Sequence, residues 1–198
     1  MKKLSLLILV LFLLSGCGGV RIYREQPLVS HDLSGYSNRR VVVLAFDEPS
    51  SQPGIGAAFA SELHRRLLQA GPFAQISLAL GSSPFSLQST PREELASAAA
   101  LGAELGADLA ITGEVERFHY SRGTDSELTV TVYFIDTVSG EVMRAESLSA
   151  RGKAGSFPPV WEPGLSSGPA KNEIVAQLAA EIVNRLVPRE EESEAEME

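Results

Sequence analysis

The chain has 198 residues, a formal net charge of −8 and an isoelectric point of about 5.0. This length is enough for one domain with a proper hydrophobic core. The acidic balance argues against a nucleic-acid partner, which selects a basic face, and against attachment to anionic lipid by charge alone.

The first segment has the layout of an export signal. Lys2 and Lys3 precede an apolar run from Leu4 to Leu14, and small residues then lead to a cysteine. Crossing a bilayer takes about 20 apolar residues, so this run is too short for a transmembrane helix. The end of the segment, Leu14, Ser15, Gly16 and Cys17, resembles the lipobox of bacterial lipoproteins.

This resemblance implies that residues 1–16 are removed and that the thiol of Cys17 is acylated, which gives a palmitate-type membrane anchor. Cys17 is the only cysteine, so it has no disulfide partner within the chain. An ordinary secretory signal with an incidental cysteine is the alternative. Gly18 stands where an aspartate would retain a lipoprotein at the inner membrane. The resemblance therefore implies the outer membrane, with the protein facing the periplasm.

Residues 17–39 show no clear periodicity, and we expect a flexible tether with a short strand at Val20 to Tyr23. As a coil, a tether of this length would span about 25–30 Å. The folded domain is expected over residues 40–187. The last residues, 188–198, are rich in glutamate and predict a solvated, disordered tail.

The first half of the domain predicts a strand, a helix, a strand and a second helix. Val41 to Phe46 is an unbroken apolar run, typical of a strand buried on both faces. Leucine and phenylalanine recur every four residues from Ile55 to Ala70, which indicates an amphipathic helix. Phe73 to Leu80 predicts a short strand. Thr90 and Glu93 form a capping-box pattern before the next helix, and Gly106 suits the left-handed position after it.

The second half predicts three antiparallel strands and a final helix. The strands are expected at Asp108 to Tyr120, Leu128 to Asp136 and Glu141 to Ala150, because apolar and polar residues alternate there. A loop over residues 151–170 and a helix from Lys171 to Val187 follow. The order β-α-β-α-β-β-β-α predicts an α+β fold with helices packed on a single mixed sheet.

The sequence holds no pattern of catalytic or metal-binding residues. His31, His64 and His119 lie in unrelated settings without metal-ligand spacing. Asp47 and Glu48 follow the first predicted strand, where α/β proteins often place functional groups, but a loop cap is the better interpretation. We therefore expect no enzyme activity, no cofactor and no metal.

The predicted 151–170 loop contains the only tryptophan. Trp161 lies close to Phe157 and Pro159 in a segment whose composition predicts exposure. Tryptophan is favoured at binding hot spots, so these residues are candidates for a partner contact. The alternative is that Trp161 packs back over the sheet or the last helix.

Several motifs together resemble one superfamily of envelope proteins. They are the Val41–Phe46 run, the helix end at Leu67–Phe73, the segment Leu101–Val115 and the strand end Asp136–Val142. The chain is similar in these to the curli-secretion-channel superfamily, which includes outer-membrane lipoprotein activators of penicillin-binding proteins. Its domain also resembles the N-terminal domain of the Tol–Pal β-propeller protein. The short 121–127 segment leaves no room for pore-forming hairpins.

The resemblance implies a non-enzymatic lipoprotein that serves as a binding or assembly module of a cell-envelope complex. Its partners would be the membrane, through the lipid, and an unidentified envelope protein, with the oligomeric state left open. An auxiliary lipoprotein of a lipid-transport ABC system is the alternative function.

Overall fold

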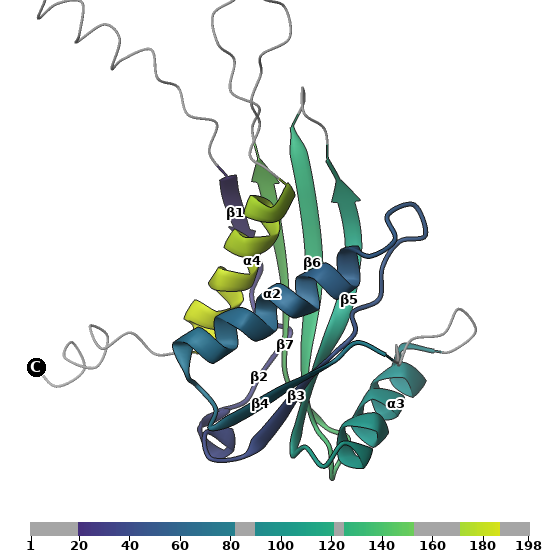
Figure 1. Ribbon diagram of the computed structural model, residues 1–198, viewed down its shortest axis with the longest axis vertical. Helices are drawn as coiled ribbons and strands as arrows, with labels where there is room; N and C mark the ends of the chain where they lie inside the picture. The colour runs from purple at the N-terminus through teal and green to yellow at the C-terminus, as the bar shows by residue number, and fades with distance from the viewer. Residues whose placement is uncertain (1–19, 82–89, 121–124, 153–170, 187–198) are drawn as a thin grey trace, which may run out of the picture.

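The computed structural model describes residues 20–81, 90–120, 125–152 and 171–186. Its centre is one mixed sheet in the order β1-β7-β6-β5-β3-β4, with β2 also paired to β7 (Figure 1). The strands are β1 (Val20–Arg24), β2 (Val29–Ser30), β3 (Arg40–Leu44), β4 (Gln75–Ala79), β5 (Leu109–His119), β6 (Ser126–Asp136) and β7 (Val142–Gly152). The predicted α+β fold with a single mixed sheet is confirmed.

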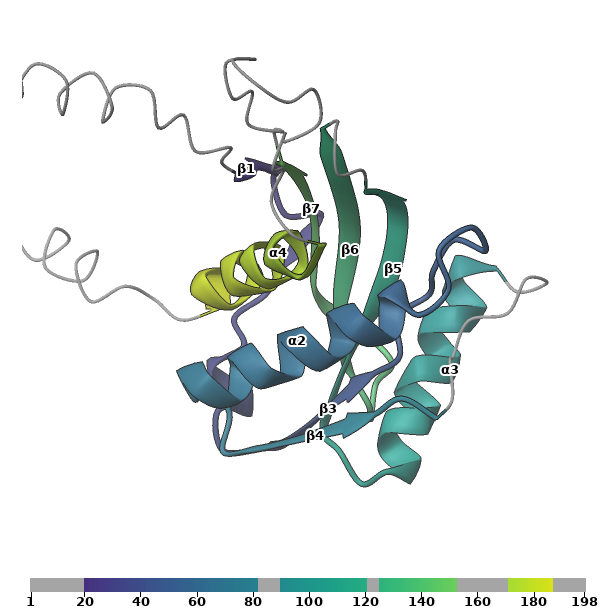
Figure 2. The same ribbon diagram turned by 45° about the horizontal axis from the view of Figure 1, so that its top comes forward.

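Two helices cover one face of the sheet and a third covers part of the other (Figure 2). Helices α2 (Ile55–Ala70) and α4 (Lys171–Leu186) pack on the larger apolar cluster, while α3 (Pro91–Glu104) packs on the smaller one. Both faces of β3 are therefore buried, which explains its unbroken apolar run. Strands β5, β6 and β7 extend beyond α3 (Figure 1).

The predicted helix ends are confirmed in detail. The Thr90 hydroxyl accepts a hydrogen bond from the Glu93 amide, and the Glu93 carboxylate accepts one from the Thr90 amide. After the helix, Gly106 has φ +72°, which side chains with a β-carbon rarely adopt. Gly102 lies where a β-carbon would come within 2.9 Å of the Ala110 side chain, so α3 packs closely on the sheet.

The short strand predicted at Val20 to Tyr23 is confirmed as β1, but the flexible tether expected up to residue 39 is wrong from Val20 onward. Residues 20–24 form β1, which pairs with β7 along its whole length, from Val20 opposite Gly152 to Arg24 opposite Leu148. Val20 and Ile22 pack against the larger apolar cluster, and burying them on this edge favours order over a solvated coil. The chain continues through β2 and a 3-10 turn, η1 (Ser34–Tyr36), before β3 begins. The folded domain thus begins at least 20 residues earlier than predicted.

The signal segment, the 151–170 loop beyond Gly152 and the acidic tail were also predicted, and these lie outside the described residues.

Candidate functional site

A charged cluster lies between β7 and α4, on the face of the sheet that α2 and α4 cover. Arg144 and Glu146 are two residues apart on β7 and therefore point to the same face. That face also carries Leu148, which is fully buried. Glu146 is 0% exposed, so its carboxylate is removed from water and needs close partners.

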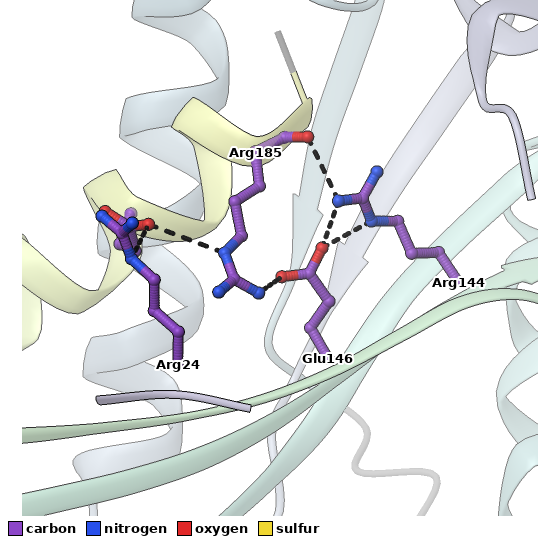
Figure 3. Close-up of polar contacts among 5 residues, drawn as sticks. Arg24, Arg144, Glu146 and Arg185 are labelled. Carbon is purple, nitrogen blue, oxygen red and sulfur yellow. Dashed lines mark hydrogen bonds and ion pairs between the residues drawn. The ribbon is translucent and has the colours of Figure 1, made fainter. Parts of the chain in front are cut away.

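Two arginines supply those partners (Figure 3). The Nε of Arg144 donates to Oε1 of Glu146 at 2.5 Å, and the Nη1 of Arg185 donates to Oε2 at 2.7 Å. Nη2 of Arg144 also donates to the backbone oxygen of Arg185, at 3.1 Å, near the end of α4. The positive charge of Arg144, close to the C-terminal end of α4, also interacts favourably with the helix dipole.

The cluster continues to the edge of the sheet. The Nε of Arg185 lies 3.6 Å from Glu181 Oε1, and the Nε of Arg24 lies 2.8 Å from the same oxygen. We call Arg24, Arg144, Glu146, Glu181 and Arg185 the buried arginine–glutamate cluster. It joins β1, β7 and α4 by charge-assisted contacts.

The geometry of this cluster suits fastening rather than catalysis. Each carboxylate oxygen of Glu146 is already bound by a guanidinium group, so neither is available to accept a proton from a substrate. No group of three or more potential metal ligands occurs among the described residues. The cluster therefore fixes the orientation of α4 and β1 on β7.

A second group of charges lies on the opposite face of the sheet, near α3. Burial raises the pKa of Glu114, and the neighbouring carboxylates of Glu116, Asp47 and Glu94 raise it further. The Thr131 hydroxyl donates to Glu116 Oε1 at 2.5 Å. The same acidic surroundings add to burial in raising the pKa of the Tyr133 hydroxyl. This part of the sheet is therefore strongly acidic.

Glu48 is a loop cap, as predicted. Its carboxylate accepts hydrogen bonds from the backbone amides of Gly54, at 2.6 Å, and Gly56, at 2.7 Å. These amides belong to the first turn of α2, whose free N–H groups and dipole favour a negative charge. Asp47 contributes through its backbone, which bonds to Gly113 and Val115 of β5.

The site residues predicted from sequence lie elsewhere. Those of the signal and lipidation site, Leu14, Ser15, Gly16 and Cys17, and the proposed partner contacts, Phe157, Pro159 and Trp161, are outside the described residues. The three histidines stay apart, with His31 after β2, His64 on α2 and His119 at the end of β5. Within the described part of the chain, no helix has the length and hydropathy to cross a membrane.

The buried arginine–glutamate cluster is not among the predicted sites, although the sequence carries a signal for it. Arg144 and Glu146 alternate in phase with Leu148 and Ala150, so two charged residues stand where the β7 pattern places core residues. Such a pattern indicates that the charges are paired inside the fold.

No family model and no curated protein matches the chain. Among solved structures, it is similar to the PelC dodecamer of Paraburkholderia phytofirmans. A single-substitution form has 16% identity and a TM-score of 0.53, over 87% of this chain and all of that one. A second crystal form has 17% identity and a TM-score of 0.52, over 87% and 99%. A lipoprotein of Neisseria meningitidis has 13% identity and a TM-score of 0.44, over 74% of this chain and 96% of that one.

The likeness to PelC shows that the two proteins share a fold, and at this level of identity it shows the fold alone. Membership of the curli-secretion-channel superfamily stays a prediction.

Proposed function

We propose that the protein is a lipid-anchored, non-enzymatic lipoprotein of the outer membrane. It faces the periplasm and serves as a binding or assembly module of a cell-envelope complex. One observation supports this proposal: a segment with the layout of an export signal leads to Cys17, and the first strand of the described residues begins three positions later, at Val20. A lipid on Cys17 would hold the domain directly at the membrane.

The contacts of β1 support the proposed attachment to the membrane at Cys17. Five residues of β1 pair with β7, and Arg24 adds an ion pair to Glu181 of α4. Glu181 also lies beside Arg185, and Arg185 is connected through Glu146 to Arg144, so the ion pair joins the rest of the buried arginine–glutamate cluster. A force on the acylated residue would therefore pass into the sheet and the last helix rather than unravel a loose terminus.

Self-association forms part of the proposal. PelC, which has the same fold, is a dodecamer in its crystals. We extend assembly from identical subunits to this chain, and we retain Trp161, Phe157 and Pro159 as the contact with a further envelope protein. Sedimentation of the detergent-solubilised mature protein should give a mass of several subunits. A strictly monomeric protein at micromolar concentration would remove self-association from the proposal.

The anchor is tested by Cys17→Ser. Intact-mass analysis of the wild-type protein should show a chain that begins at Cys17 and carries acyl groups. Cys17→Ser should remain an unprocessed precursor or become soluble, whereas Gly18→Ala should be acylated normally. An unmodified Cys17 thiol in the wild-type protein would contradict the proposal.

Sorting and activity need separate measurements. Gly18→Asp should move the acylated protein to the inner-membrane fraction, and Gly18→Ala should leave it in the outer membrane. Hydrolase and transferase screens should show no turnover. Uptake of a fluorescent lipid by the purified protein would instead favour the lipid-transport alternative.

A further inference from the structure

The distance from the lipid anchor to the sheet is short and fixed by the covalent chain. Three peptide units separate Cys17 from Val20, and they span at most about 11 Å in any conformation. Acyl chains on Cys17 would hold this residue at the level of the lipid headgroups. The first residue of β1 would then lie within about one headgroup layer of the membrane. This step depends on the proposed acylation.

Strands β1, β7 and β6 end at the same level. Val20 pairs with Gly152 of β7, and Gly152 pairs with Ser126 of β6. In the next row, Arg21, Arg151, Glu127 and His119 lie in register across four strands. Figure 1 shows these strand ends together, opposite the end of the sheet that carries the β6–β7 turn. Strand β6 has eleven residues, so that turn lies about 35 Å away.

Among the described residues, three exposed arginines lie at this end of the sheet, on the face that α3 covers only farther along. Arg21, Arg117 and Arg151 belong to β1, β5 and β7. Glu127 lies between two of them, 3.9 Å from Arg117 and 3.4 Å from Arg151. The single carboxylate of Glu127 cannot neutralise both neighbouring arginines. Arg21 of β1 pairs with Arg151 of β7. We call Arg21, Arg117 and Arg151 the arginine end.

Opposite charges gather farther along the same face. Glu116, Asp47 and Glu94 lie close enough to Glu114 to raise its pKa, and this acidic group is nearer to α3. The net charge of −8 therefore conceals an uneven distribution, with basic groups beside the anchored strand and acidic groups beyond them. Anionic headgroups would attract the first set and repel the second.

We infer that the arginine end lies on the membrane surface and that Arg21, Arg117 and Arg151 bind lipid phosphate groups. The β5–β6–β7 sheet then stands upright, and the β6–β7 turn points into the periplasm. Guanidinium groups suit this contact because they donate several hydrogen bonds in a plane that matches phosphate oxygens. The short link to Cys17 makes lipid, rather than a soluble partner, the occupant of this surface.

Orientation can be measured with two labels. Cys17 is the only natural cysteine and its thiol is blocked when acylated, so an introduced cysteine can be labelled alone. Asp125, beside the arginine end, and Val138, which is 91% exposed in the β6–β7 turn, are suitable positions. Acylated Asp125→Cys and Val138→Cys proteins would carry a fluorophore in vesicles that contain a headgroup-level quencher.

Quenching should be several-fold stronger at position 125 than at position 138. Equal quenching, or stronger quenching at 138, would overturn the upright orientation. Failure of the acylation proposal has a different signature, because mass analysis would then show an unmodified Cys17.

Phosphate binding by the arginine end is tested with a variant that lacks its three positive charges. In vesicles with phosphatidylglycerol, the combined Arg21→Gln, Arg117→Gln and Arg151→Gln protein should lose at least half of the quenching at position 125. Arg39→Gln, also an exposed arginine but bound to Asp108, is the control and should lose none. Glu127→Gln should increase the quenching, since it removes the carboxylate between two arginines. Unchanged quenching in the triple variant, with an unchanged urea midpoint, would overturn phosphate binding.

Discussion

Glu146 and Glu127 occur in similar settings on opposite faces of one sheet. Glu146 lies on β7 and Glu127 on the neighbouring strand β6, and each carboxylate has two arginines beside it. Glu146 is 0% exposed and bonds to both partners within 2.7 Å. The Glu127 side chain is 26% exposed, and its partners are 3.4 and 3.9 Å away.

This difference shows that burial, rather than the pair of residue types, decides what an ion pair does. Around Glu146, each charge has lost its water, so the partners depend on one another and hold β7 to α4. Around Glu127, water still solvates all three groups, and the pairs add little to stability. The exposed arginines are then free to exchange Glu127 for another anion.

The largest expected effect is that of Glu146→Gln. The substitution keeps the size of the side chain but leaves the mostly buried Arg144 and Arg185 without their shared negative charge. Breaking a buried pair from one side costs about 3–5 kcal/mol. Urea unfolding should show a loss of this size with the m-value unchanged. A loss below about 1 kcal/mol would mean that the buried cluster contributes no more than a surface pair.

Gly106→Val measures the loss of stability from a substitution that changes no charge. Gly106 has φ +72°, and a β-branched residue resists this conformation, so the free energy of unfolding should fall by more than about 1 kcal/mol. The Gly106→Asn variant should lose less of the free energy of unfolding, because asparagine tolerates the left-handed region. The readout is the urea midpoint. Equal midpoints for wild type and Gly106→Val would contradict the role of Gly106 as the residue that ends α3.

Local signals explain how much of the fold the sequence predicts. The capping box at Thr90 and the four-residue spacing in α2 depend on neighbours in the chain, and both elements begin where expected. The alternation in β5, β6 and β7 is also local, and their ends differ from the prediction by no more than about two residues. The fold class follows from the order of these elements.

Long-range pairing explains what the sequence does not predict. The sequence predicts a short strand at Val20 to Tyr23, but it does not predict that this strand pairs with β7, whose Gly152 lies far away in the chain. Glu146 likewise depends on Arg185 of the last helix. Local spacing predicts neither contact, because both form only when distant segments pack. Cys17 and Trp161 remain predictions, since they lie outside the described residues.

Asp136 provides an intermediate case, because its partner is a neutral phenol. The Tyr36 hydroxyl donates to Asp136 Oδ2 at 2.6 Å, which lowers the pKa of the carboxyl. Burial, together with Asp136, raises the pKa of Tyr36 to about 12. The tyrosine contribution to stability is therefore complete below its unfolded pKa of about 10 and is lost as the pH rises toward 12.

Tyr36→Phe should cost about 1.5 kcal/mol at pH 7, the lower end for a hydrogen bond to a charged group, since the Tyr36–Asp136 contact is only partly buried. The difference between wild type and variant should shrink as the pH rises above 10, which urea midpoints at pH 8 and pH 11 would show. A difference that stays constant across this range would mean that the Tyr36–Asp136 contact does not control the titration of the phenol.

The smallest effect on stability is expected from Glu127→Gln. The substitution removes the negative charge that lies between Arg117 and Arg151, but water solvates both arginines and the distances are long. The free energy of unfolding should change by less than about 0.5 kcal/mol, and added salt should reduce even that difference. Measured beside Glu146→Gln under the same conditions, this variant isolates burial as the variable, because both substitutions remove one carboxylate from between two arginines. A loss of several kcal/mol from Glu127→Gln would show that the ion pairs of Glu127 stabilise the fold as much as those of Glu146.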